Sequence, residues 1–364
     1  MGNFLQFRHF DSVNFSWNEV TGAIGDSVTV LPIVVAVGVL TDLSLVLMLV
    51  WFGVFQVVWG LVYGVPISVE PMKALAALIL AGSITTGELL IAGLLLAAIL
   101  LGIGLTNSLQ RFGQYIGDPV VRGIQFGVAL VLLETGLGLG LGDPQMAAIA
   151  GGIVAVVVLI GYWNVSALIV LIAGGIVAAM QTGLPTPGAP TTAGMMLFSP
   201  ADLTLPAFEA TIAQLAMTVG NAALATSVLL YDYFDRDISA DDLCTSMGAM
   251  NAVAIPFGAL PMCHGSGGVA GKYAFGARTA GANLILGIGY IAIGILAVGL
   301  VVAYPVAMLG VILILIALQL GRTSIVQTDT VWLAVGIGVL GLLINLGLAF
   351  IIGIAIWLAL DRWR

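Results

Sequence analysis

Two short stretches decide how this chain folds: GVPISVEPMKALAA at Gly64–Ala77 and PMCHGSGGVAGKYAFGART at Pro261–Thr279. Both place proline, glycine and charge inside sequence that otherwise reads as hydrocarbon. Proline disfavours helix at the residue before it, so the residues leading to Pro71 are predicted to be extended. A helix can begin at Pro71, because the first turn needs no N–H there. Each stretch therefore predicts an extended segment followed by a half-length helix.

The rest of the composition predicts a polytopic helical membrane protein. Of the 364 residues, 60% are hydrophobic and only 8% are charged, against about 25% charged in soluble domains. Apolar runs of about 20 residues recur along the chain, long enough to cross a bilayer as helices. The chain shows no catalytic motif, no zinc spacing for its two cysteines and no basic nucleic-acid patch, so we expect no enzyme activity, cofactor, metal site or nucleic-acid partner.

Charge sets the predicted topology. We predict about fourteen segments, at 17–39, 42–63, 65–82, 86–105, 118–138, 144–161, 163–181, 208–230, 241–257, 259–276, 280–302, 304–320, 329–345 and 347–360. With both termini cytoplasmic, nine cations fall on the cytoplasmic side, as the positive-inside rule requires: Arg8, Arg111, Arg122, Arg236, Lys272, Arg278, Arg322, Arg362 and Arg364. Of the ten Lys and Arg residues only Lys73 remains, and it lies within a span. We expect a multi-pass protein of the plasma membrane.

Fourteen segments divide into two sets of seven, and an odd set must run inverted relative to its partner. The first repeat covers 1–182, an external linker rich in Pro, Gly and Thr covers 183–207, and the second repeat covers 208–364. The broken segments are the third of each repeat. That arrangement is typical of inverted-repeat transporters with a binding site near the membrane midplane.

Inverted repeats turn the N-termini of the two half-helices toward each other. Each N-terminus carries unpaired N–H groups and about half a positive charge, so a facing pair favours an anion. Lys73 adds a full charge, and glycine lets backbone N–H groups approach a ligand. The residues predicted to contact substrate are Glu70, Pro71, Met72, Lys73, Cys263, His264, Gly265, Ser266, Gly267 and Asn221.

The same two stretches resemble the signature motifs of the molybdate transporter family, distant relatives of the SulP sulfate permeases. Those motifs read close to P-x-x-Q-P-M-K-x-I-A-A and P-x-C-H-G-A-G-G-L-A-x-Q-Y-x-F-G-A-R, and GAIGDSVTVLP at 22–32 resembles the family's first span. Two departures stand out: Glu70 replaces a Gln, and Gly271-Lys272 replaces x-Gln.

The resemblance implies the seven-plus-seven fold of SulP proteins and nucleobase permeases. It implies a transport core at 17–106 plus 208–303, a gate at 107–182 plus 304–360, and no cytoplasmic STAS domain. It also implies a homodimer.

Ionisable groups inside a bilayer usually face a cavity or a partner. Asp26, Glu70 and His264 are the candidates for coupling transport to H⁺ or Na⁺. Five of the site residues also have a structural alternative. Lys73 could pair with Glu70 or Asp26, Glu70 could cap a helix, and His264 could be a hydrogen-bonded core residue. Ser266 could likewise cap a helix, and Asn221 could bridge helices.

The function that these features favour is secondary transport of a tetrahedral oxyanion, molybdate first and sulfate second, by alternating access. A nucleobase permease of the same fold is the first alternative, because the Glu70 carboxylate could accept a hydrogen bond from a ring N–H. An anion channel is the second alternative.

Overall fold

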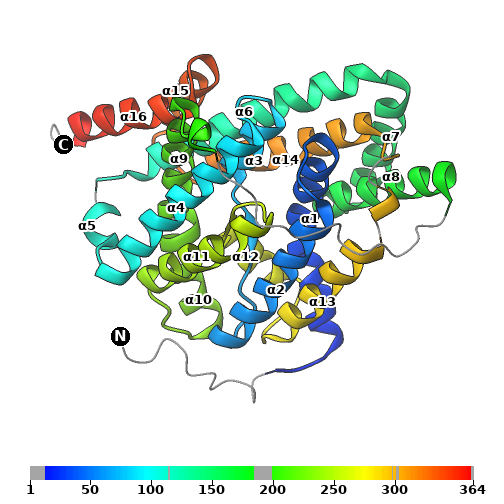
Figure 1. Cartoon of the computed structure of the whole chain (residues 1–364), viewed down its shortest axis with the longest axis horizontal. Helices are drawn as coiled ribbons and strands as arrows, with labels where there is room; N and C mark the ends of the chain where they lie inside the picture. The colour runs from blue at the N-terminus through cyan, green and yellow to red at the C-terminus, as the bar shows by residue number, and fades with distance from the viewer. Residues whose placement is uncertain (1–12, 114, 184–198, 297, 301–302, 362–364) are drawn as a thin grey trace.

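The computed structural model of the chain describes residues 13–113, 115–183, 199–296, 298–300 and 303–361. The described part is almost entirely helical (Figure 1). Its first half contains α1 (Trp17–Leu40), α2 (Leu45–Tyr63), β1 (Glu70–Pro71), α3 (Lys73–Leu80), α4 (Thr86–Thr106), α5 (Leu109–Gly113), α6 (Asp118–Gly142), α7 (Pro144–Leu159), η2 (Trp163–Val165) and α8 (Ser166–Thr182).

In the second half, longer helices again precede and follow one short helix that comes after a two-residue strand, in the order seen in the first half. It contains η3 (Pro200–Asp202), α9 (Leu205–Met217), the π-helix η4 (Thr218–Ala225), α10 (Thr226–Phe234), α11 (Ala240–Ala254), η5 (Ile255–Phe257), β2 (Met262–Cys263), α12 (Ser266–Ala274), α13 (Gly281–Leu296), η6 (Val298–Leu300), α14 (Val306–Val326), α15 (Val331–Leu343) and α16 (Leu346–Asp361).

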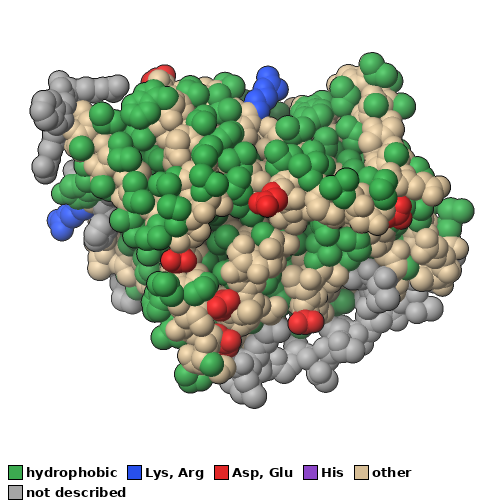
Figure 2. All heavy atoms as spheres, turned by 90° about the horizontal axis from the view of Figure 1, so that it is seen from above, with side chains coloured by type: hydrophobic (Ala, Val, Ile, Leu, Met, Phe, Trp, Pro, Cys, Tyr) green, Lys and Arg blue, Asp and Glu red, His purple; other side chains and the backbone are tan. Residues whose placement is uncertain are grey.

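Length and composition make this a membrane protein. Within the described residues, seven helical stretches are long and apolar enough to span a bilayer. They are Trp17–Leu40, Leu45–Tyr63, Thr86–Thr106, Asp118–Gly142, Trp163–Thr182, Leu205–Phe234 and Val306–Val326. Figure 2 shows one face of the molecule covered mainly by hydrophobic side chains with scattered charges, as a lipid-facing surface requires. Helices lie at each of the fourteen expected segments, and the number that cross the membrane stays a prediction.

The sequence sets where the helices next to the site begin and end. Gly64 ends α2 in the left-handed region, with φ 69°. The chain then runs extended through β1, and α3 begins only at Lys73, so α3 is 8 residues long. Thr85 and Glu88 form a reciprocal capping box that starts α4. The helix that includes α9 and α10 continues through the π-helical turns of η4.

Packing pairs elements of one half with elements of the other. In one group of helices, α2 packs on α13 and α4 on α11, while α1 packs on α12 and α3 on α9. In the second group, α6 packs on α14 and α15, and α14 also contacts α7 and α8. Figure 1 shows α6, α14, α15 and α16 along the upper part of the view, with α2, α10, α11 and α13 below. The contacts occur in matched pairs: α2–α13 with α4–α11, α1–α12 with α3–α9, and α6–α15 with α7–α14.

One prediction from charge is wrong. Lys272 was expected among the cytoplasmic cations, but its side chain is fully buried in the core, where an acidic partner neutralises it. Arg8, Arg362 and Arg364 lie outside the described residues, as does most of the predicted linker 183–207. The division into a core and a gate stays a prediction.

Candidate anion-binding site

An antiparallel strand pair joins the two halves at the centre of the molecule. In β1–β2, Glu70 lies opposite Cys263 and Pro71 opposite Met262. The Met72 N–H extends the pairing by donating to the Pro261 carbonyl at 2.9 Å. Glu70 and Cys263 each precede their half-helix by three residues, since α3 begins at residue 73 and α12 at residue 266. The pairing therefore brings equivalent points of the two halves, and the helix starts behind them, face to face.

The carboxylate of Glu70 lies at the N-terminus of α12. Glu70 is fully buried, and its Oε1 accepts a hydrogen bond from the Gly268 N–H at 2.8 Å and one from Ser68 Oγ at 3.3 Å. Its Oε2 forms an ion pair with Lys73 in the first turn of α3. The anion-favouring end of one half-helix is thus satisfied by a side chain from the opposite half. Both alternatives weighed for Glu70 and Lys73, a helix cap and an ion pair, occur together.

A residue that the sequence analysis missed caps the other half-helix. Gln214 of α9 accepts hydrogen bonds at Oε1 from the N–H groups of Ala74, at 2.9 Å, and Leu75, at 3.4 Å. Its amide nitrogen donates to Thr218 Oγ1 at 3.1 Å, which fixes the orientation of the side chain. The N-terminus of α3 therefore holds a neutral acceptor, whereas that of α12 holds a charged one.

The side of the site that is open to a ligand is formed by four of the predicted residues. Lys73 retains 14% side-chain exposure, Ser266 and Asn221 are half-buried, and Gly267 is exposed. Ser266 Oγ donates to Asn221 Oδ1 at 2.5 Å. Within the described ranges, the N–H groups of Ser266 and Gly267 have no hydrogen-bond partner. These donors are available to an anion.

The glycines around the start of α12 differ in the space beside them. A Cβ at Gly265 would collide with the Glu70 carboxylate, and a Cβ at Gly268 would collide with Asp26, Ser68 and Glu70. A Cβ at Gly267 would meet nothing within 4 Å. Gly265 and Gly268 are therefore needed for close packing on the site, while Gly267 borders open space.

The remaining predicted residues are deeply buried. His264 is fully buried, and its Nδ1 must donate to the Ser68 carbonyl at 2.9 Å, because a carbonyl only accepts. Its Nε2 lies 2.8 Å from Ser246 Oγ. Met72 and Cys263 are also buried, and Cys263 Sγ lies 3.9 Å from the Pro71 carbonyl. In this conformation His264 cross-links the two halves and does not face the open side.

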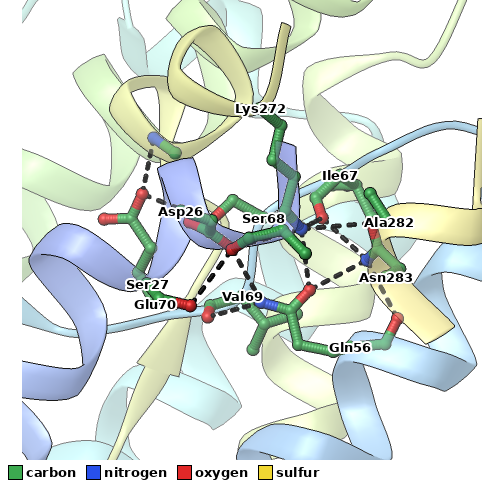
Figure 3. Close-up of polar contacts among 12 residues, drawn as sticks. Asp26, Ser27, Gln56, Ile67, Ser68, Val69, Glu70, Lys272, Ala282 and Asn283 are labelled. Atoms are coloured by element: carbon green, nitrogen blue, oxygen red, sulfur yellow. Dashed lines mark hydrogen bonds and ion pairs between the residues drawn. The ribbon is translucent and has the colours of Figure 1, made fainter. Parts of the chain in front are cut away.

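Behind the strand pair lies a second buried ion pair, between Asp26 of α1 and Lys272 of α12 at 3.1 Å (Figure 3). Ser68 connects it to Glu70, because Ser68 Oγ also donates to Asp26 Oδ1 at 2.6 Å. Gln56 Oε1 and Asn283 Oδ1 complete the network by accepting hydrogen bonds from Lys272 Nζ. The two departures from the family motifs, at Glu70 and Lys272, therefore belong to one network and carry opposite charges. An added acid and an added base at two motif positions were the sequence signal that could have identified Lys272 as part of the buried network.

One cleft borders this region at Gly267, and a second lies at the far end of α3. A cleft of about 790 Å³ lies between α1 and α12 on one side and η2 and α14 on the other, and it is lined by Gly267, Asn164, Gln319 and Arg322. A second cleft of about 580 Å³ begins near the end of α3 and is lined by Glu134 and Glu209. Among the described residues, no group of three His, Cys, Asp or Glu side chains could hold a metal ion.

Solved structures share this architecture. The chain is similar to the transmembrane domain of a cyanobacterium bicarbonate transporter, BicA, with a TM-score of 0.70 and 18% identity, covering 96% of this chain and 99% of that one. It is also similar to murine solute carrier 26 family member A9, an anion transporter in the inward-facing state. For that structure the TM-score is 0.69 at 13% identity, covering 97% and 70% of the two chains.

Sequence comparisons define the family more narrowly than the fold does. The family model described as molybdate transporter of the MFS superfamily matches residues 18–132 and 206–320. Molybdate transporter 2 of Arabidopsis thaliana is 27% identical over 366 residues, covering 84% of this chain and 78% of the relative. Molybdate transporter 1 of the same plant is also 27% identical, covering 84% and 79%.

The fold, the paired half-helices and these matches define a multi-pass membrane transporter of anions. More narrowly, the chain belongs to the molybdate transporter family, which confirms the resemblance seen in its two motifs.

Proposed function

We propose that this protein is a secondary active transporter of a tetrahedral oxyanion, with molybdate as the first substrate and sulfate as the second. The observation that carries the proposal is the β1–β2 pair, which sets the starts of α3 and α12 against each other in a buried site. Helix N-termini bind oxyanions through N–H groups and the helix dipole. Membership of the molybdate transporter family supports the choice of substrate.

In the proposed bound state the oxyanion replaces the Glu70 carboxylate at α12. Its oxygens accept from the N–H groups of Ser266, Gly267 and Gly268, and Lys73 supplies the neutralising charge. Asn221, which already meets Ser266, orients that hydroxyl. Protonation of Glu70 would favour this exchange, because a neutral carboxyl no longer repels the dianion. On this basis the coupling ion is a proton.

Alternating access requires one group of helices to move past the other. The inverted repeat is supported by the paired contacts of equivalent elements and by the two family-model matches, each of which spans 115 residues (132 − 18 + 1 and 320 − 206 + 1). The proposed core contains both half-helices, and the proposed gate contains α6–α8 and α14–α16. We propose that the cleft lined by Gly267 and Arg322 separates core from gate and opens toward the cytoplasm, where Arg322 would attract anions.

Uptake into proteoliposomes tests the proposal. We expect saturable uptake of radiolabelled molybdate, competition by sulfate and tungstate, no competition by uracil, and stimulation by an inward proton gradient. Competition by uracil alone would instead indicate a nucleobase permease. Conductance without saturable exchange would indicate a channel.

The cellular arrangement belongs to the same proposal. We propose a multi-pass protein of the plasma membrane with both termini cytoplasmic, functioning as a homodimer. Mass photometry in mild detergent measures the assembly directly, and a purely monomeric protein would contradict the dimer.

A further inference from the structure

Four oxygen atoms contact the ammonium of Lys272, and together they form a cage around it (Figure 3). Four elements contribute one oxygen each: α1, α2, the extended segment before β1, and α13. The distances from Lys272 Nζ are 3.1 Å to Asp26 Oδ2, 2.9 Å to Gln56 Oε1, 2.6 Å to the Ile67 carbonyl and 3.1 Å to Asn283 Oδ1. Asp26, Gln56 and Asn283, whose side-chain oxygens accept from the ammonium, are fully buried, and so is Lys272.

Other hydrogen bonds hold the cage in shape independently of the lysine. The Gln56 amide nitrogen donates to Asp26 Oδ2 at 2.9 Å and to the Val69 carbonyl at 3.2 Å. The Asn283 amide nitrogen lies within hydrogen-bond distance of three acceptors, the Gln56 carbonyl at 2.9 Å, Gln56 Oε1 at 2.9 Å and the Ile67 carbonyl at 2.8 Å. Both amide groups are thereby turned so that their oxygens face the ammonium. None of these hydrogen bonds involves the ammonium.

The chemistry of the cage is that of a site for a monovalent metal ion. Its ligands are a carboxylate, two side-chain amide oxygens and a backbone carbonyl from an unwound segment, which are hard oxygen donors suited to alkali-metal ions in transporters. An ammonium has three donor hydrogens, fewer than the four oxygens around it. Asp26 is the one carboxylate in the cage. The neighbouring carboxylate, Glu70, is paired with Lys73. One positive charge therefore balances the cage.

We propose that the Lys272 ammonium is a tethered substitute for an alkali-metal cation, Na⁺ or K⁺, and that the cage becomes a binding site for such an ion when the lysine is removed. The cage lies directly behind β1, and the charge in it holds the carbonyl of Ile67. The ammonium therefore fixes the position of the extended segment, and this segment includes Glu70 of the anion site. Resting on the proposed function, this means that anion transport by the native chain needs no alkali-metal ion, because the cation is attached to the protein.

Thermal unfolding of purified Lys272→Met tests the cage without reference to transport. The unfolding midpoint is measured in NaCl, in KCl and in N-methyl-D-glucamine chloride. We expect the midpoint of Lys272→Met to rise by about 3 °C or more in about 100 mM NaCl or KCl relative to N-methyl-D-glucamine, since an ion that binds only the folded state stabilises it. The native protein should show equal midpoints in all three salts.

Two controls isolate the cage. Asp26→Asn combined with Lys272→Met removes the carboxylate as well, so its midpoint should not respond to Na⁺ or K⁺. Lys73→Met removes a cation that has no such cage, and it should not respond either. Equal midpoints of Lys272→Met in all three salts would overturn the proposal. Failure of both Lys272→Met and Lys272→Ala to fold in Na⁺ and in K⁺ would also overturn it, because a bound ion should restore the missing charge.

Molybdate uptake by the native protein provides the second readout. Replacing Na⁺ and K⁺ with N-methyl-D-glucamine should leave the rate unchanged, and an absolute requirement for either ion would refute the tethered cation. If the native chain transported no oxyanion while Lys272→Met still gained stability in Na⁺ or K⁺, the proposed function would fail and the cage would stand.

Discussion

Replacing Glu70 with glutamine should strengthen oxyanion binding, because it removes the negative charge that occupies the N-terminus of α12. The substituted glutamine can still accept the hydrogen bond from the Gly268 N–H, which Glu70 receives at 2.8 Å, so the strand pair should be kept. At an effective dielectric constant of about 20, each negative charge of an oxyanion about 5 Å from the carboxylate is repelled by about 3 kcal/mol. A bound oxyanion that shares this helix start would lie at about that separation from the carboxylate.

A repulsion of that size corresponds to about a hundredfold in affinity, and the open side of the site reduces it by solvent screening. We therefore expect Glu70→Gln to bind molybdate at least about tenfold more tightly at neutral pH. The native protein should bind more tightly as the pH falls, since anion binding is linked to proton uptake by Glu70. The variant should lose that pH dependence.

Isothermal titration of the purified proteins with molybdate over a pH series measures both effects. Glu19→Gln is the matched control, because Glu19 is a buried carboxylate that accepts from the N–H groups of Thr279 and Ala282 at the start of another helix, α13. It should change stability and leave molybdate affinity and its pH dependence as they are. If Glu70→Gln binds molybdate more weakly than the native protein, the carboxylate is not a competitor of the anion and the reasoning is wrong.

Three further predictions concern the same site and the topology. Lys73→Met keeps the bulk of the side chain and removes its charge, so molybdate affinity measured by titration should fall at least about tenfold, and unchanged affinity would place the anion elsewhere. Gly268→Ala should lower the yield of folded protein in size-exclusion chromatography because its Cβ collides with buried side chains, whereas Gly267→Ala should fold normally; equal yields would contradict this. Single cysteines within 199–207 should react with impermeant reagents from outside only, and those within 231–242 from inside only, with the reverse pattern refuting the topology.

The sequence was sufficient for features that depend on neighbouring residues. Pro66 and Pro71 predict the extended stretch, but the helix start expected at Pro71 is wrong: Pro71 of β1 pairs with Met262, and α3 begins at Lys73. The glycines from 265 to 268 predict close backbone approach, and two of them pack tightly against acidic side chains. Local rules of proline and glycine geometry decide these points, so no knowledge of distant contacts is needed.

Contacts between the halves could not be predicted in the same way. Gln214 caps α3 from about 140 residues away in sequence, and Glu70 caps α12 from 198 residues away. Nothing near either residue identifies its partner. The charge pattern predicts Lys272 at the cytoplasmic side, because its neutralising partner, Asp26, is far away in sequence, on the first helix. A count of charges along the chain cannot separate a buried ion pair from a surface cation.

The strand pair at the centre also has a consequence for biosynthesis. Glu70 and Cys263 lie opposite each other but are 193 residues apart in sequence (263 − 70). At a translation rate of about 5–20 residues per second, the ribosome needs about 10–40 s to deliver the second partner after the first. During that interval the extended segment lies in the bilayer with its hydrogen bonds to β2 unmade and the carboxylate of Glu70 without its helix. The first half must therefore wait in the membrane as an incomplete structure, and insertion of the second half completes both.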